Sequence, residues 1–234
     1  MEQKVLIIIP TYNEMENIEN LLRAIHGEVP AAHILVVDDN SPDGTSGLVE
    51  NIMAGDPRVK LLKRAGKLGL GSAYIAGFKY ALAEGYDVVF EMDADFSHNP
   101  AYLPRFLKAI EEADLALGSR YVEGGGVENW PVTRKLISIG GSLYSRMILS
   151  VPYHDLTGGF KCFRRTALEA INLDDVRSEG YSFQIEMTYR AHKKGLRIKE
   201  IPIVFTDRAG GKSKMSWKIF LEAIYRVWQI RLTV

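Results

Sequence analysis

The sequence predicts an α/β fold built on a mostly parallel β-sheet, with helices on both of its faces. Three observations lead to this prediction. Continuous apolar runs at residues 5–9, 34–37 and 88–90 are typical of strands that are buried on both faces. Segments with apolar side chains at helical spacing follow these runs. Repeated alternation of such strands and helices is characteristic of parallel sheets covered by helices.

The first half of the chain has the more regular pattern. Asn13, with Glu16 three residues later, is expected to cap the first helix, and Gly27 is expected to end it. The other expected elements are helices around residues 48–53, 73–81 and 102–112, and strands near 59–62 and 115–119. The turn after the first strand lacks glycine, and Tyr74 stands where a third glycine of a later Gly-rich loop would fall. A nicotinamide-binding Rossmann domain is therefore disfavoured.

Beyond Arg120 the pattern is less regular. The expected elements are a helix from about residue 134, a helix over 183–191, a strand over 198–205 that Pro202 interrupts, and a closing helix from about residue 217. No linker, internal repeat or low-complexity segment divides the sequence. We therefore expect a single domain, residues 1–234, with halves at 1–120 and 121–234.

Composition limits the classes of function. The 234 residues are 47% hydrophobic and 25% charged, which is typical of a globular protein. Lys and Arg together number 29, as do Asp and Glu, so the formal net charge is zero and a nucleic-acid partner is disfavoured. The single cysteine, Cys162, excludes an internal disulfide and favours a reducing compartment.

The sequence also gives an expectation about location. No apolar run reaches the roughly 20 residues needed to span a bilayer. Residues 1–4 lead directly into a strand, without the long apolar region of a signal peptide. We therefore expect a cytoplasmic protein that is at most peripheral to a membrane.

Acidic side chains follow three of the predicted strands. Glu14 lies shortly after the first strand, Asp39 after the second, and Asp93 and Asp95 after the fourth. Because ligands of α/β sheets bind at the carboxyl ends of the strands, these side chains are expected to share one site. Carboxylate oxygens suit a divalent cation that in turn holds phosphates. The alternative for a bare Asp-x-Asp sequence is a solvated turn.

Basic side chains are expected in loops on the same side of the sheet. They are Lys67, Arg120, Arg134, Arg208 and Lys214. Carboxylates on a metal, with cations beside it, are what a departing diphosphate needs. The alternative is that these residues form ordinary ion pairs on the surface.

Several motifs resemble those of inverting family 2 glycosyltransferases, which have the GT-A fold, a sheet of Rossmann-like type. These motifs are PTYNE at residues 10–14, VDDNSPDGT at 37–45 and DAD at 93–95. Further motifs resemble the dolichyl- or polyprenyl-phosphate mannose synthase subgroup, across nearly the full chain: LGLGSAY at 68–74, SRY at 119–121, DLTGGF at 155–160, and Asp207, Arg208 and Lys214. The resemblance implies transfer of mannose, with inversion, from GDP-mannose to a dolichyl or polyprenyl monophosphate.

The resemblance also implies roles for individual residues on the donor side. Residues 1–120 would form the nucleotide-sugar-binding half. Its nucleoside pocket would be lined by Tyr12 and Asp39, and completed by Pro10, Glu14 and Val37. The sugar diphosphate would be held by Asp93, Ala94 and Asp95. Asp93 and Asp95 would be the ligands of Mg²⁺ or Mn²⁺, and Asp95 the firmer of the two.

On the acceptor side, residues 121–234 would form a half that ends in an amphipathic helix. The cations implied to handle the diphosphate and the acceptor phosphate are Arg120, Arg134, Arg208 and Lys214. Asp95, Arg120 and Lys214 are the residues implied to be catalytic. Ser97 stands where some archaeal relatives carry a metal-binding Gln, so water is expected to replace that ligand.

The chemistry implied by the resemblance needs no protein base. A phosphate monoester has its second pKa near ~6, so a lipid phosphate is already largely dianionic at neutral pH. The protein then has to position two anions and stabilise the departing diphosphate. The sequence has no evident catalytic histidine, and His98 is expected to be a turn or packing residue.

Three other functions are compatible with parts of the pattern. A nucleotidyltransferase would ordinarily have a Gly-rich loop after the first strand, where this chain has Pro10-Thr11-Tyr12-Asn13. A polyprenyl-phosphate glucosyltransferase that uses UDP-glucose would share most of the motifs. A non-catalytic subunit that binds a nucleotide sugar is the third, although the intact acidic pair argues against it.

The closing segment, residues 217–234, predicts contact with a membrane surface. Its polar stripe is narrow: Lys218, Glu222, Arg226 and Gln229. Most of its other side chains are large and apolar, and Trp217, Tyr225 and Trp228 suit the level of lipid headgroups. We expect peripheral contact at the cytoplasmic face of a membrane. The alternative is that the helix packs on its own domain or on a membrane-anchoring partner subunit.

Overall fold

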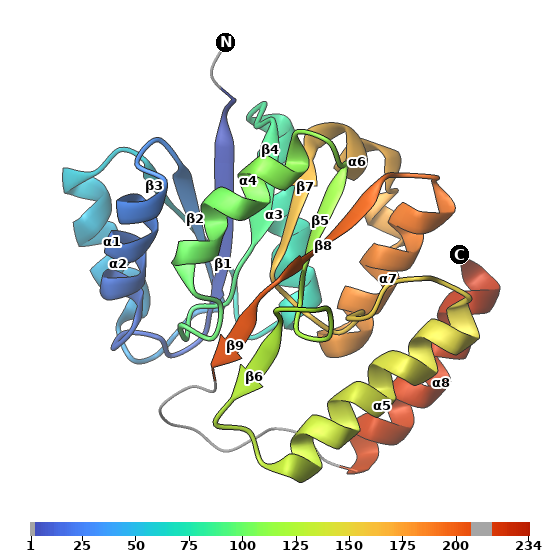
Figure 1. Cartoon of the computed structure of the whole chain (residues 1–234). Helices are drawn as coiled ribbons and strands as arrows, with labels where there is room; N and C mark the ends of the chain where they lie inside the picture. Colours follow the sequence, from blue (N-terminus) through green and yellow to red (C-terminus); the bar gives the residue numbers. More distant parts are fainter. Residues whose placement is uncertain (1–2, 207–216) are drawn as a thin grey trace.

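The fold is organised around one seven-stranded sheet (Figure 1). The computed structural model describes residues 3–206 and 217–234, with side chains described for 3–206 and 225–234. The sheet has the order β3-β2-β1-β4-β7-β5-β8. Its strands are β1 (Val5–Thr11), β2 (His33–Asp38), β3 (Val59–Lys63), β4 (Val88–Glu91), β5 (Leu115–Ser119), β7 (Lys161–Arg164) and β8 (Ile198–Pro202). Only β7 runs antiparallel to its neighbours within this sheet, so the mostly parallel sheet is confirmed.

Helices cover both faces of the sheet, as the alternating pattern predicts. They are α1 (Ile18–Glu28), α2 (Thr45–Gly55), α3 (Leu70–Ala83), α4 (Leu103–Ile110), α5 (Val132–Leu149), α6 (Arg165–Ala170), α7 (Gly180–Lys193) and α8 (Trp217–Thr233), with 3₁₀ turns η1 (Pro100–Tyr102) and η2 (Leu173–Asp175). Ile7 and Ile9 of β1 pack with α1, α2 and α4 on one face. Leu6 and Ile8 pack with α3, α6 and α7 on the other. Both faces of β1 are therefore apolar, which explains its unbroken hydrophobic run.

The helices α5 and α8 lie side by side at one end of the molecule, apart from the layers that cover the sheet (Figure 1). A smaller apolar cluster joins them to α7 through Leu149, Ile185, Tyr189, Val227 and Ile230. Both helices were expected from the sequence. None of the helices in the described part of the chain is both long enough and apolar enough to cross a membrane.

The strand β7 was not predicted from the sequence. It has only four residues and begins and ends with the charged side chains of Lys161 and Arg164, so its apolar pattern is short. It lies between β4 and β5, in a buried part of the sheet. The strand expected over residues 198–205 is interrupted after Pro202 as predicted. Its second part, β9 (Val204–Thr206), pairs instead with β6 (Gly126–Glu128) in a separate two-stranded sheet.

The predicted N-terminal cap of the first helix is wrong. The helix begins at Ile18 and its N-cap position is Asn17. Asn13 instead has a left-handed backbone, with φ of 62°, and its N–H donates to Oγ of Ser41 at 3.0 Å. The chain therefore uses Asn13 to turn at the edge of the sheet before the helix starts. Gly27, expected to end the helix, lies within its last turn.

Candidate active site

The site begins at the carboxyl ends of three adjacent strands, β2, β1 and β4. Asp38, the last residue of β2, is fully buried and accepts hydrogen bonds from Thr11, Ser41 and Ser46. Burial would raise the pKa of Asp38, but these hydrogen bonds hold it below its ordinary value. Asp38 is therefore an ionised anchor for the loops, and the next residue, Asp39, is the acid that extends beyond the sheet.

Asp39 connects the end of β2 to the Gly-rich loop before α3. Its Oδ2 accepts a hydrogen bond from the N–H of Leu68 at 3.1 Å, and its Oδ1 lies 3.2 Å from Nε of Arg64. The same loop places Nζ of Lys67 over the ring of Tyr12, 4.0 Å from the ring centroid. The ring of Tyr12 is an exposed aromatic surface at this edge. The structure thus brings together the predicted nucleoside residues Tyr12 and Asp39, and adds a cation to them.

The three other residues predicted for the nucleoside pocket have different surroundings. Pro10 is partly buried near the end of β1, where it pairs in register with Val37. Val37 is fully buried in the core between the sheet and α3. Glu14 is half-buried, and its Oε2 accepts a hydrogen bond from the side chain of Asn17 at 3.0 Å. Contact of these three residues with a base stays a prediction.

Asp93 and Asp95 follow the end of β4, as predicted, and both are partly exposed. Oδ1 of Asp95 accepts a hydrogen bond from the N–H of Ser97 at 3.1 Å. Oδ1 of Asp93 accepts one from the hydroxyl of Tyr74 at 3.3 Å. Ala94, between the two acids, is buried in the core. The motif is therefore an anchored turn that presents two carboxylates.

The donor set fits a hard divalent cation in part. Within residues 3–206 and 225–234, no group of three or more His, Cys, Asp or Glu side chains is arranged to hold a metal. Two carboxylates are nevertheless enough when substrate phosphates supply further oxygens, which is how Mg²⁺ is commonly bound. The hydroxyl oxygen of Ser97, in the same turn, is buried and has no hydrogen-bond partner among the described residues. The chemistry of these groups suits Mg²⁺ or Mn²⁺ together with a diphosphate.

Arg120 was expected to be a loop cation, but it lies buried directly after β5. Its guanidinium bonds both carboxylate oxygens of Asp155, at 2.6 and 2.7 Å, and Oγ1 of Thr157 at 2.8 Å. Burial opposes the charge on Arg120, but the Asp155 carboxylate outweighs it and raises the pKa of the guanidinium. Burial likewise opposes the charge on Asp155, and Arg120 holds its pKa below the ordinary value. The positive charge of Arg120 is therefore already balanced by Asp155.

The remaining predicted cations are placed only in part. Arg134 lies in the first turn of α5, with its guanidinium carbon 4.1 Å from the ring centroid of Trp130. Arg208 and Lys214 lie outside the described residues.

The surroundings of three side chains near the acids go beyond what the sequence predicted. His98, expected to be a turn or packing residue, does stack on Phe160 at 4.9 Å, but its Nδ1 also accepts a hydrogen bond from the N–H of Asp93 at 3.0 Å. Glu91 and Lys161 face each other across β4 and β7, both fully buried. Burial raises the pKa of Glu91 to about 7 and lowers that of Lys161 to about 8. The apolar run around Glu91 was the only sequence signal of such a buried pair.

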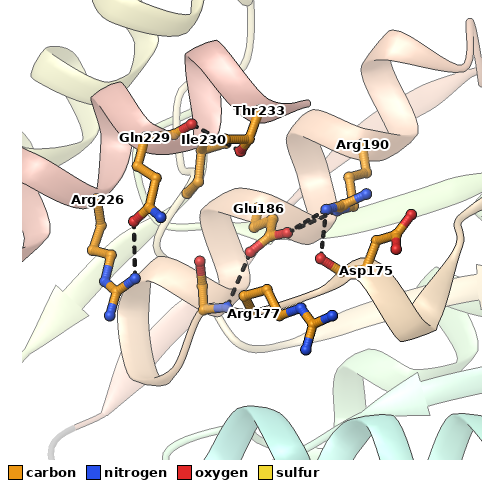
Figure 2. Close-up of a pocket in the computed structure, with 9 residues that line it drawn as sticks. Asp175, Arg177, Glu186, Arg190, Arg226, Gln229, Ile230 and Thr233 are labelled. Atoms are coloured by element: carbon orange, nitrogen blue, oxygen red, sulfur yellow. Dashed lines mark hydrogen bonds and ion pairs between the residues drawn. The ribbon is translucent and has the colours of Figure 1, made fainter.

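A pocket of about 190 Å³ lies elsewhere, between the segment before α7, α7 itself and α8 (Figure 2). Its charged groups are largely paired. Nε of Arg190 donates to Glu186 at 2.8 Å, and Arg226 donates to Gln229 at 2.9 Å. None of the site residues predicted from the sequence and described by the structure lines this pocket. We therefore assign the candidate active site to the strand ends rather than to this pocket.

Two curated relatives are similar to this chain over nearly its full length. One is "Polyprenol monophosphomannose synthase" of Mycolicibacterium smegmatis, 50% identical over 233 residues, which cover 98% of this chain and 88% of the relative. The other is "Undecaprenyl-phosphate mannosyltransferase" of Micrococcus luteus, 50% identical over 224 residues, which cover 96% of this chain and 92% of the relative.

Solved structures at low identity have the same fold. Glucosyl-3-phosphoglycerate synthase from Mycobacterium tuberculosis, in complex with Mn²⁺, UDP and glucosyl-3-phosphoglycerate, matches with a TM-score of 0.68 at 18% identity, over 99% of this chain and 79% of that chain. The mannosyltransferase PcManGT from Pyrobaculum calidifontis, in complex with GDP-Man and Mn²⁺, matches with a TM-score of 0.62 at 18% identity, over 100% of this chain and 65% of that chain. The expected GT-A fold is thereby confirmed.

The family expected from the motifs is confirmed as well. Residues 6–171 match the family described as Glycosyl transferase family 2, and this segment ends just after α6. It includes the carboxyl ends of β1, β2, β4 and β5, after which Tyr12, Asp39, Asp93, Asp95 and Arg120 lie. The chain belongs to glycosyl transferase family 2.

Proposed function

We propose that the protein transfers mannose from GDP-mannose to a polyprenyl or dolichyl monophosphate, with inversion. The observation that carries this proposal is 50% identity, over at least 96% of the chain, to two enzymes whose names specify mannosyl transfer to polyprenyl carriers. The arrangement at the strand ends supports it, because an acidic pair and an aromatic nucleoside surface lie on adjacent strands. Turnover with GDP-mannose, compared with UDP-glucose, on undecaprenyl phosphate tests the donor directly. Preference for UDP-glucose would contradict the proposal.

Within this function, Asp93 and Asp95 would hold Mg²⁺ or Mn²⁺. The ion would stabilise the negative charge of the departing diphosphate. Mn²⁺ accompanies the nucleotide or nucleotide sugar in both solved relatives described above, which supports a metal of this kind here. Ala94, at the centre of the motif, would contribute its backbone to the same diphosphate. Ser97 is short, so water would supply a further ligand.

The nucleoside would bind across the ends of β1 and β2. Tyr12 offers an exposed ring for stacking, and Asp39 is held in place by Leu68 and Arg64. Pro10, Glu14 and Val37 would complete the pocket. We assign this binding to residues 1–120 and the acceptor to residues 121–234.

Positive charge would bring two anionic substrates together. We assign this role to Arg120, Arg134, Arg208 and Lys214, and count Arg120 and Lys214, with Asp95, as the catalytic set. Two hydrogen bonds to Asp155 hold the guanidinium of Arg120 in one position. Arg120 would therefore present a fixed positive charge to the diphosphate. Fixed charges of this kind stabilise a developing negative charge without having to reorganise.

The acceptor phosphate itself would be the nucleophile, so the rate should follow its ionisation. We expect the acid side of the pH–rate profile to rise with the second phosphate pKa, near ~6. A phosphorothioate acceptor, which has a lower second pKa, should move this limb to lower pH by the same amount. Two results together would establish a protein base instead. The acid limb would stay in place with the phosphorothioate acceptor, and it would disappear in a carboxylate-to-amide variant that still binds nucleotide.

Contact with a membrane surface would bring the enzyme to its lipid acceptor. Five exposed apolar side chains of α5 repeat at three- and four-residue spacing, which places them on one face: Val132, Leu136, Ile139, Leu143 and Met147. Neighbouring α8 exposes Tyr225, Trp228 and Leu232. Helix α5 has three basic residues and no acidic one. An apolar face on a helix whose charged residues are all basic suits an anionic lipid surface.

This membrane contact predicts a charge-sensitive result. Leu136→Asp combined with Leu143→Asp should abolish flotation with vesicles that contain anionic phospholipid, because the two changes put charge into the apolar face. The matched control is Asn20→Asp with Asn51→Asp, which adds the same charge at exposed positions of α1 and α2. The control should float like the unchanged protein. A protein that never floats, or that forms dimers through this face, would contradict the proposed contact.

A further inference from the structure

The carboxylate of Asp93 lies between two buried side chains. On one side, the hydroxyl of Tyr74 donates to Oδ1 at 3.3 Å. On the other side, Nε2 of His98 lies 3.8 Å from Oδ2. The backbone N–H of Asp93 also donates to Nδ1 of the same histidine at 3.0 Å. Asp93 is thus hydrogen-bonded at its main-chain N–H and at Oδ1, and its Oδ2 has the His98 ring nearby.

The hydrogen bond to Nδ1 determines which tautomer His98 has. An N–H can only be accepted by an unprotonated ring nitrogen, so the proton of the neutral ring is on Nε2. That N–H therefore faces the Asp93 carboxylate. The ring is 2% exposed, stacks on Phe160 and meets Phe205 edge to face, so its orientation is fixed by packing.

Tyr74 is fixed in a similar way from the opposite face of the site. It is fully buried on α3, and its ring stacks with those of Phe78 and Phe183, at centroid distances of 6.3 and 5.9 Å. A tyrosine hydroxyl carries a proton that it can donate, and here it donates to the Asp93 carboxylate. Nothing in apolar packing requires this hydroxyl, since phenylalanine would fill the same space.

We propose that Tyr74 and His98 are positioning residues that fix the orientation of the Asp93 carboxylate for the divalent cation and the donor diphosphate. The inference rests on the proposed metal role of Asp93. Groups that hydrogen-bond a metal ligand orient it, and their loss typically costs about 10- to 100-fold in metal affinity or activity. Tyr74 and His98 act through Asp93 and touch no reacting atom.

The test measures metal affinity without turnover. The melting temperature of the protein with GDP is followed while Mn²⁺ is titrated, and the half-saturating Mn²⁺ concentration is compared among variants. Tyr74→Phe removes only the hydroxyl and should raise that concentration about 10-fold. Tyr80→Phe, a partly buried tyrosine on the same helix, is the matched control and should leave it unchanged.

Two substitutions at His98 separate positioning from packing. His98→Phe keeps a ring on Phe160 but removes the acceptor for the Asp93 N–H, whereas His98→Asn removes the ring but offers an oxygen near the place of Nδ1. Positioning predicts that the Phe variant binds Mn²⁺ more weakly than the Asn variant. If His98 serves packing alone, the Phe variant should have a higher metal-free melting temperature than the Asn variant. Neither variant should then change the affinity for Mn²⁺.

The outcomes are separable from failure of the metal proposal. If Asp95→Asn and the unchanged protein respond equally to Mn²⁺, the metal site itself is wrong, and the inference is overturned with it. If Asp95→Asn abolishes the response while Tyr74→Phe and His98→Phe retain unchanged half-saturation, only the positioning role is overturned. Weaker Mn²⁺ binding in both variants, with partial recovery in His98→Asn, supports it.

Discussion

Asp95→Asn is expected to lower turnover by about 100- to 1,000-fold, because a metal-bound diphosphate gains several kcal/mol of charge stabilisation in the transition state. The amide keeps the size of the side chain and an oxygen that accepts the N–H of Ser97, so the turn should remain folded. What is lost is one negative charge facing the cation. Initial rates with GDP-mannose and undecaprenyl phosphate, over a Mn²⁺ series, measure the effect.

A control separates this loss from a general effect of removing a carboxylate. Asp174→Asn removes an exposed acid that pairs with Lys79 on the surface, and it should leave the rate unchanged. The melting temperature of metal-free Asp95→Asn should stay close to that of the unchanged protein, since Asp95 is partly exposed. Full turnover in Asp95→Asn, or full turnover of the unchanged protein in excess chelator, would show that Asp95 holds no essential metal.

The centre of the sheet was predictable because β1, β2 and β4 are formed by runs of buried, mostly apolar residues. The runs that became β1, β2 and β4 needed no knowledge of their neighbours to be recognised. Strand β7 depends on tertiary structure instead. Its first residue, Lys161, is tolerated in the sheet because its ammonium donates to the backbone oxygen of Gln184 at 2.8 Å and also to that side chain. A sequence pattern does not report such a distant partner.

The acidic part of the site was predictable for a related reason. Strand ends in a parallel sheet converge, so Asp39 and Asp93 could be assigned to one edge before any geometry was known. The surroundings of these acids could not be assigned in this way. The contact of Tyr74 with Asp93 depends on how α3 packs on the sheet, and the ring of His98 is held by Phe160 and Phe205, which lie far along the chain. Arg120 was expected in an open loop because its partner, Asp155, is 35 residues away.

That partnership leads to the second large effect, which concerns stability. Arg120→Met leaves the buried carboxylate of Asp155 without its counter-charge, and Asp155→Asn leaves the buried guanidinium without its own. Breaking a buried pair from one side typically costs about 3–5 kcal/mol. For a protein of this size the melting temperature should fall by roughly 10 °C in each single variant. Thermal unfolding followed by circular dichroism measures the change.

The double variant, Arg120→Met with Asp155→Asn, tells whether the pair is structural or also catalytic. Because neither charge is left unpaired, the double variant should lose less stability than the two single losses added together. If Arg120 also stabilises the diphosphate, turnover stays low in the double variant at a temperature where it is fully folded. Arg120→Lys keeps the charge but loses the bidentate contact with Asp155. Its turnover should therefore lie between that of the unchanged protein and that of Arg120→Met. If turnover is restored in the double variant, the pair is purely structural. If the stability losses of the two single variants add up in the double variant, the two charges are not coupled.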